Sequence, residues 1–170
     1  MRATAVNTNW AYPPVPGDDR KRCGNATFAA RRCTRERIAV GVRGEIDAVN
    51  ARDLGRYVVH HTRASRQLVL DLRAVDFFGT QGFTALYYIS VHCTRADVDW
   101  TIVASRPVRR LLTICEPDGE LPVADNLRSA LNRLDRIADS RHHTSWAART
   151  GWAVPSAPTR AAHRRHGRAS

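Results

Sequence analysis

Hydrophobic and polar positions follow two different periods between residues 26 and 138. At 26–33 and 37–43, apolar side chains alternate with smaller or polar residues at a period of two, which predicts two strands joined by a polar turn. The runs at 67–72 and 100–104 are almost wholly apolar, as in strands that are buried on both faces of a sheet. We therefore expect a buried sheet core.

Helical spacing separates these strands. Apolar residues recur three and four positions apart over residues 49–64, which predicts a first helix. The same spacing returns after a turn at Gly79–Gly82, which opens a second helix that continues to about Thr94. A third helix is expected to begin at Pro107, and a last one after Asp125, which we predict to be its N-cap. This alternation predicts an α/β fold, a small sandwich in which a mixed β-sheet is flanked by about four α-helices.

Charge is concentrated at the two ends of the chain. The sequence has 170 residues and a formal net charge of +11, yet residues 26–140 hold 17 basic and 14 acidic groups. We therefore predict one globular domain over 26–140, with a flexible N-terminal tail at 1–25 and a basic, disordered C-terminal tail at 141–170. No apolar run approaches the roughly 18 residues of a membrane span, and the first residues lack the apolar region of a secretory signal. These features indicate a cytoplasmic protein without membrane contact.

Residue patterns for catalysis, cofactors or metals are not evident. The chain contains no glycine-rich phosphate loop and no Cys-x-x-Cys pair. His61 is expected to pack in a partly buried position on its helix rather than to bind a metal. We therefore predict no enzyme activity, no cofactor and no metal site.

The turn at Gly79–Gly82 is the most informative segment. It follows a buried strand and presents Thr80 at the start of a helix, where the hydroxyl could accept a backbone N–H as a cap. Helix N-termini also favour negative charge, so Thr80 could instead carry a phosphate without unfolding the helix. Gly82 would allow the backbone of a partner to approach closely.

Four landmarks in order resemble the STAS domain of bacterial anti-sigma factor antagonists. They are Gly44-Glu45-Ile46-Asp47, Val69-Leu70-Asp71-Leu72, Phe77-Phe78-Gly79-Thr80-Gln81-Gly82-Phe83 and Val108-Arg109-Arg110-Leu111-Leu112. The resemblance covers about 26–138 and implies a mixed sheet flanked by helices. It also implies a binding protein that captures an anti-sigma factor of the Ser/Thr kinase type and so releases a sigma factor.

The same resemblance implies a phosphorylation switch. The kinase would phosphorylate Thr80 and so release the antagonist, and a phosphatase would reverse this. At this turn the family usually has Asp-Ser-Ser-Gly or Asp-Ser-Thr-Gly, so Gly79 stands where the acid is common, and binding without a working switch is an alternative. The expected partner-binding residues are Asp47, Asn50, Gly79, Gln81, Gly82 and Phe83.

Two other hypotheses follow from the residues. The Arg-rich C-terminal tail could bind nucleic acid electrostatically, which would make the protein a nucleic-acid-associated regulator. Alternatively, Cys93 and Cys115 end the apolar stripes of two helices and could form a reversible disulfide in a redox-responsive binding module, although free Cys residues are commonly buried in cores.

Overall fold

The computed structural model describes the backbone of residues 18–150 and the side chains of residues 18–141. Its strands are β1 (Asp19–Cys23), β2 (Ala26–Arg32), β3 (Arg37–Ile46), β4 (Gln67–Phe78), β5 (Asp99–Ala104) and β6 (Val123–Ala124). Its helices are α1 (Ala51–Thr62), α2 (Thr80–Arg95), α3 (Arg106–Cys115) and α4 (Leu127–Thr150).

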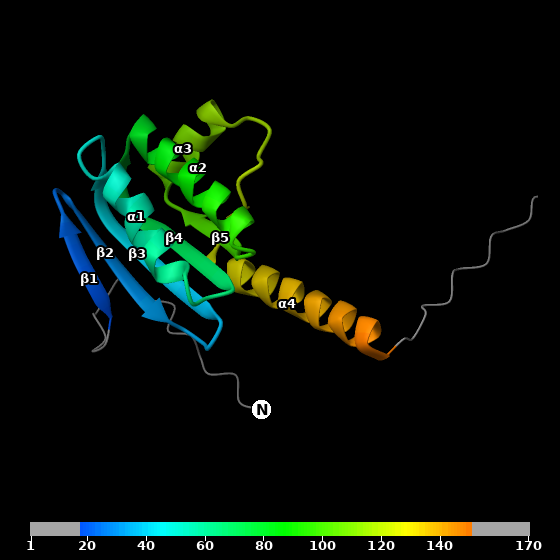
Figure 1. Cartoon of the computed structure of the whole chain (residues 1–170). Coiled ribbons are helices and arrows are strands. Elements are labelled where there is room, and N and C mark those ends of the chain that lie inside the picture. The colour runs from blue at the N-terminus through cyan, green and yellow to red at the C-terminus, as the bar shows by residue number, and fades with distance from the viewer. Residues whose placement is uncertain (1–17, 151–170) are drawn as a thin grey trace, which may run out of the picture.

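A single mixed sheet organises these elements (Figure 1). Its strands lie in the order β1-β2-β3-β4-β5-β6. The pairs β1–β2 and β2–β3 are antiparallel, whereas β3, β4, β5 and β6 are parallel neighbours. In the β3–β4 pair Ile46 lies opposite Phe78, so these two long strands end side by side.

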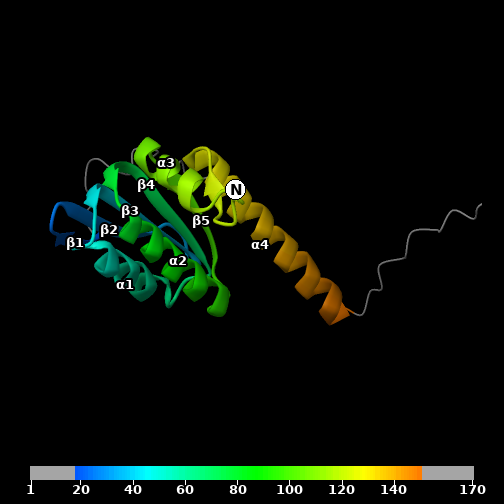
Figure 2. The ribbon, with the colours of Figure 1, turned by 90° about the horizontal axis from the view of Figure 1, so that it is seen from above.

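The two faces of the sheet are covered unequally. The larger core lies under α1, α2 and α3, which contribute buried apolar residues such as Leu54, Leu86 and Val108. On the other face, α4 packs Leu127 and Leu134 against a smaller cluster. Figure 2 shows α1 and α2 side by side along one side of the sheet and α4 running away from its other end. The predicted α/β class, with a mixed sheet and four helices, is confirmed.

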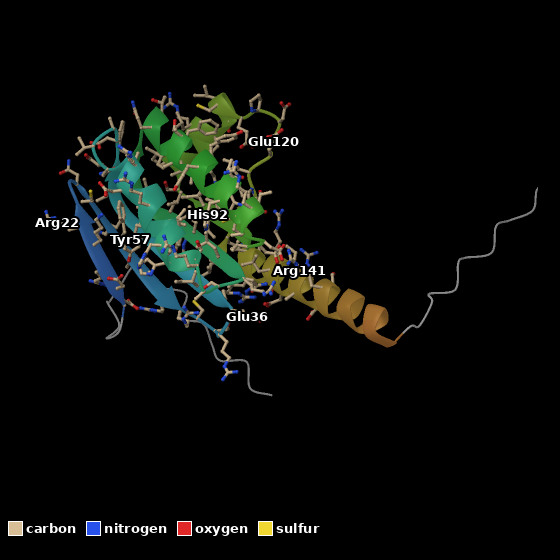
Figure 3. The ribbon with its side chains drawn as sticks, in the orientation of Figure 1. Arg22, Glu36, Tyr57, His92, Glu120 and Arg141 are labelled. Carbon is tan, nitrogen blue, oxygen red and sulfur yellow. The ribbon has the colours of Figure 1, made fainter. Side chains whose placement is uncertain are left out.

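Strand β1 lies inside the segment that we expected to be an N-terminal tail. Its charged composition concealed it, because four of its five residues are exposed and only Cys23 is partly buried against the core. Polar contacts fix it to α1. The Lys21 ammonium lies 2.9 Å from Asp53, and the Tyr57 hydroxyl donates a 2.7 Å hydrogen bond to the Asp19 carbonyl. Figure 3 labels Tyr57 on α1 and Arg22 on β1. The domain therefore begins before residue 26.

The C-terminal boundary also differs from the prediction. Helix α4 continues to Thr150, beyond residue 140. Arg141 contributes to this because its guanidinium binds Asp97 at 2.7 and 2.9 Å and Asp99 at 2.9 Å, next to the beginning of β5. Residues 1–17 and 151–170, and with them most of the predicted tails, lie outside the described residues.

Two local predictions are wrong at this level. Strand β4 continues past residue 72 to Phe78, because it stays paired with β3 up to Ile46. The cap of α4 is Asn126 rather than Asp125, since the Asn126 side-chain oxygen accepts the Ser129 N–H at 2.9 Å. Within residues 18–150, no helix is both long and apolar enough to cross a membrane.

Candidate functional site

The turn that holds Thr80 lies against the end of β3. The Gly79 N–H donates a 2.8 Å hydrogen bond to the Ile46 carbonyl, which ties together the carboxyl ends of two parallel strands. Asp47 follows Ile46 directly, and Thr80 follows Gly79 directly. Asp47 and Thr80 are far apart in the sequence, but they follow the carboxyl ends of two neighbouring parallel strands. Ligands of open α/β sheets commonly bind at this edge.

Thr80 is the first residue of α2, and its side chain is exposed. Its predicted capping role is wrong, because Gly79 occupies the N-cap position with extended φ and ψ values of −83° and 172°, and no side chain caps the helix. The Thr80 hydroxyl instead donates to the side-chain oxygen of Gln81 at 3.3 Å, and both groups are exposed. The hydroxyl is therefore accessible at the positive end of the α2 dipole.

Asp47 is held in a tight turn before α1. One of its carboxylate oxygens accepts the Val49 N–H at 2.9 Å, and its carbonyl accepts the Ala51 N–H at 3.0 Å. The residue is half-buried, and it directly follows Ile46, whose carbonyl accepts the Gly79 N–H of the turn that contains Thr80. Asp47 therefore has a fixed orientation and an accessible charge.

Asn50 is a structural residue rather than a surface contact. It is fully buried, its side-chain oxygen accepts the Asp47 N–H at 3.1 Å, and its amide donates to the carbonyls of Glu45 and Cys23 at 2.9 and 3.3 Å. Direct contact of Asn50 with a partner stays a prediction, while in this structure its side chain bonds only to its own chain. Its burial is explained by the Asp47 N–H and the carbonyls of Glu45 and Cys23, because these backbone groups need hydrogen-bonding partners inside the fold.

Gly82 and Phe83 also face the interior more than predicted. Gly82 is buried, and a Cβ atom at this position would lie only 2.7 Å from the Phe78 ring. The glycine therefore allows the ring of its own chain to approach, rather than the backbone of a partner. Phe83 is half-buried and packs against the core. Of the predicted set, Thr80 and Gln81 are the exposed members, while Asp47 and Gly79 are half-buried.

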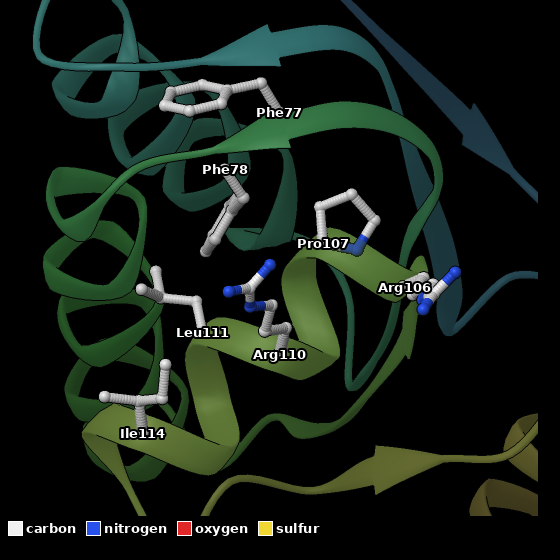
Figure 4. Close-up of a pocket in the computed structure, with 7 residues that line it drawn as sticks. All are labelled: Phe77, Phe78, Arg106, Pro107, Arg110, Leu111 and Ile114. Carbon is white, nitrogen blue, oxygen red and sulfur yellow. The ribbon is translucent and has the colours of Figure 1, made fainter.

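Two grooves that the sequence did not reveal flank the beginning of α2. One, of about 480 Å³, lies between α1 and α2. Its lining includes Ala48, Ala51, Arg52, Gly55, Arg56, Gln81, Thr84, Ala85 and Tyr88. The other, of about 530 Å³, lies between the end of β4 and α3 (Figure 4). Phe77 and Phe78 both line it from the end of β4, the first exposed and the second buried.

The two cysteines of the predicted redox pair come from different helices, α2 and α3. Cys93 is fully buried in the core, Cys115 is exposed at the end of α3, and both thiols are unlinked. Burial raises the pKa of Cys93 to about 12, so its reactive thiolate form is scarce at neutral pH. The two thiols therefore lie in different environments, one in the core and one in solvent.

His61 packs as expected, with its ring centroid 4.5 Å from that of Tyr57. Burial lowers the pKa of His61, although the Asp19 carboxylate lies 2.9 Å from Nε2, because Asp19 is itself largely exposed and its charge is screened. No cluster of three or more metal-ligating side chains occurs in the described part of the chain. The nucleic-acid hypothesis concerns residues that lie mostly outside it.

Comparison with known families gives a match over most of the described residues. The family model described as the STAS domain matches residues 30–130. The osmosensory protein A of Mycobacterium tuberculosis is 32% identical over 106 residues, which cover 60% of this chain and 67% of that protein. The anti-sigma-F factor antagonist RsfA of the same species is 33% identical over 99 residues, covering 56% of this chain and 77% of the relative.

Solved structures show the same architecture. An anti-sigma factor antagonist from Mycobacterium paratuberculosis superimposes with a TM-score of 0.53 at 26% identity, covering 64% of this chain and 92% of that one. Unphosphorylated SpoIIAA gives 0.54 at 14% identity, covering 64% and 96% of the two chains. A serine-to-glutamate variant of Moorella thermoacetica RsbS gives 0.56 at 18% identity, covering 66% and 97%. The last two similarities concern the fold alone.

Proposed function

The chain belongs to the STAS domain family, and from this membership we propose that it is a cytoplasmic anti-sigma factor antagonist. It binds an anti-sigma factor of the Ser/Thr kinase type and thereby releases a sigma factor. It acts by binding rather than by catalysis. Relatives that are named anti-sigma factor antagonists support this proposal.

The observation that carries the proposal is the accessibility of the Thr80 hydroxyl. It is exposed at the first position of α2, and it donates a hydrogen bond to an exposed neighbouring side chain rather than to the core. A kinase could therefore reach it without breaking a cap or opening the core. The N-terminal turn of a 16-residue helix also stabilises a phosphate, so phosphorylation leaves the fold intact.

The effect of phosphate on binding follows from its charge. A phosphothreonine adds about −1.5 to −2 charge at neutral pH. Asp47 follows β3 at the same sheet edge at which Thr80 follows β4, so this phosphate would add to the negative charge that the Asp47 carboxylate gives to the edge. Like charges at an interface that excludes water are costly to desolvate, so a partner that contacts both residues loses affinity. A phosphatase would restore the binding state.

Thr80 substitutions test this proposal. We expect Thr80→Glu to weaken binding of the cognate kinase-type anti-sigma factor by about tenfold or more, since a loss of about 1.4 kcal/mol is tenfold in Kd. Thr80→Ala removes the hydroxyl without adding charge and should bind as the wild type does. Pull-down with the purified anti-sigma factor, followed by titration, measures both variants. Equal binding by the two variants would rule out the switch, and no binding by the wild type to any such factor would rule out the function.

A further inference from the structure

The groove between the end of β4 and α3 has apolar walls and a basic rim. It is lined by Phe77, Phe78, Arg106, Pro107, Arg110, Leu111 and Ile114. Phe77 is 52% exposed and Ile114 is 69% exposed, and both border this one groove. Neither is covered by another described part of the chain, so both are available to a partner.

Arg110 gives this groove a specific chemistry. Figure 4 shows its side chain directed toward Phe78, whereas Arg106 points away from the other lining residues. The neighbouring Arg109 donates to the carbonyls of Ala104, Ala124 and Asp125, so its guanidinium is occupied within the fold. Among residues 18–141, no ion pair is recorded for Arg110 or Arg106, and α3 contains no acidic residue.

The groove is continuous with the turn that holds Thr80. Phe77 and Phe78 directly precede Gly79, and a Cβ atom at Gly79 would lie 3.5 Å from the edge of the Phe77 ring. Phe77 therefore borders both the N-cap of α2 and the groove. A partner seated on Thr80 reaches the groove without crossing another element.

We infer that this groove receives an acidic, amphipathic segment of the anti-sigma factor. Apolar side chains of the segment would pack on Phe77 and Ile114, while a carboxylate binds Arg110. A segment of this kind matches both the apolar walls and the uncompensated cation, whereas a nucleic acid backbone would leave the apolar walls exposed. The inference rests on the proposed function and adds a second anchor beside Thr80.

A charge reversal with a matched control tests the inference. The probe is the purified kinase-type anti-sigma factor that Thr80→Ala binds. We expect Arg110→Glu to weaken its binding by about tenfold or more and Ile114→Ser to weaken it severalfold, as residues at the centre of an interface do. Arg128→Glu makes the same change of charge at an exposed position of α4, on the opposite face of the sheet, and should leave the affinity within about twofold.

The outcomes separate this inference from the proposed function. Equal losses of affinity for Arg110→Glu and Arg128→Glu would show a long-range charge effect and would overturn the inference that the groove binds the partner. Unchanged affinity for Arg110→Glu and Ile114→Ser, with Thr80→Glu still defective, would also overturn it while the proposed function stands. If no such anti-sigma factor binds the wild type or Thr80→Ala, both fail. Circular dichroism confirms that each variant is folded.

Discussion

Gly79 and Gly82 flank Thr80, but they differ in the space around them. Gly79 has a negative φ, and a Cβ atom there would meet its neighbours at ordinary contact distances of 3.5 Å. Gly82 has no such room, because the Phe78 ring lies against it. The first glycine is therefore open to substitution, while the second is fixed by packing.

This difference gives a paired stability prediction. Gly79→Asp should raise the free energy of unfolding by about 0.5 to 1 kcal/mol, because the carboxylate can cap α2 and the unfolded chain loses freedom. Gly82→Ala should lower it by about 1 to 3 kcal/mol through overpacking against Phe78. Urea denaturation of both variants beside the wild type measures the difference. Opposite signs are the essential result, and two equal losses would contradict the geometry.

A second prediction at this scale concerns pH and His61. Burial lowers the pKa of His61 in the folded protein, so the unfolded chain binds a proton more readily. Stability from this residue is therefore present above its unfolded pKa of about 6.5 and is lost as the pH falls below that value. Between pH values of about 7.5 and 5.5, on either side of that pKa, unfolding free energies should fall less in His61→Asn than in the wild type. His61→Gln should behave like His61→Asn, and a fall as large as that of the wild type in both variants would contradict the prediction.

Elements were predictable from the sequence wherever burial imposed a regular pattern. The helix expected at 49–64 is α1, and the apolar run at 100–104 is most of β5. Strand β1 could not be found in this way, because an edge strand with exposed side chains has no apolar alternation. The end of β4 was missed because its pairing depends on the distant β3, which a local pattern does not contain.

The candidate site was predictable only in part. Its position followed from the order of the strand, turn and helix around Thr80. The inward orientation of Asn50 was not predictable, because its partners include the Cys23 carbonyl, which lies 27 residues away in sequence. The groove on α3 was likewise invisible, since it is formed by residues from two separate elements.

Charge is distributed unevenly over the whole molecule. The three helices on one side of the sheet, α1, α2 and α3, contain one acidic residue, Asp53, and it binds Lys21 of β1. Arg52 and Arg56 line the groove between α1 and α2, and Arg106 and Arg110 line the groove on α3. The helical side therefore presents a cationic surface around Thr80, which favours an acidic partner.

This asymmetry predicts salt-sensitive association. We expect the association rate of the anti-sigma factor to fall by about tenfold between low and high ionic strength, whereas the dissociation rate changes much less. Stopped-flow or surface plasmon resonance measurements at several salt concentrations separate the two rates. Arg52→Gln combined with Arg56→Gln should reduce the salt dependence. An association rate that does not depend on salt would contradict electrostatic attraction by this surface.

Strand β1 has a consequence for self-association. It closes one edge of the sheet with Asp19, Arg20, Lys21 and Arg22, all of which are exposed (Figure 3 labels Arg22). If a second copy paired with this edge, the basic side chains of the two β1 strands would repel each other. This repulsion disfavours edge-to-edge aggregation. The strand beneath it, β2, has the buried residues Ala26, Phe28 and Ala30 and no such protection. Proteolysis that removed β1 would therefore expose this edge of the sheet to pairing with a second copy.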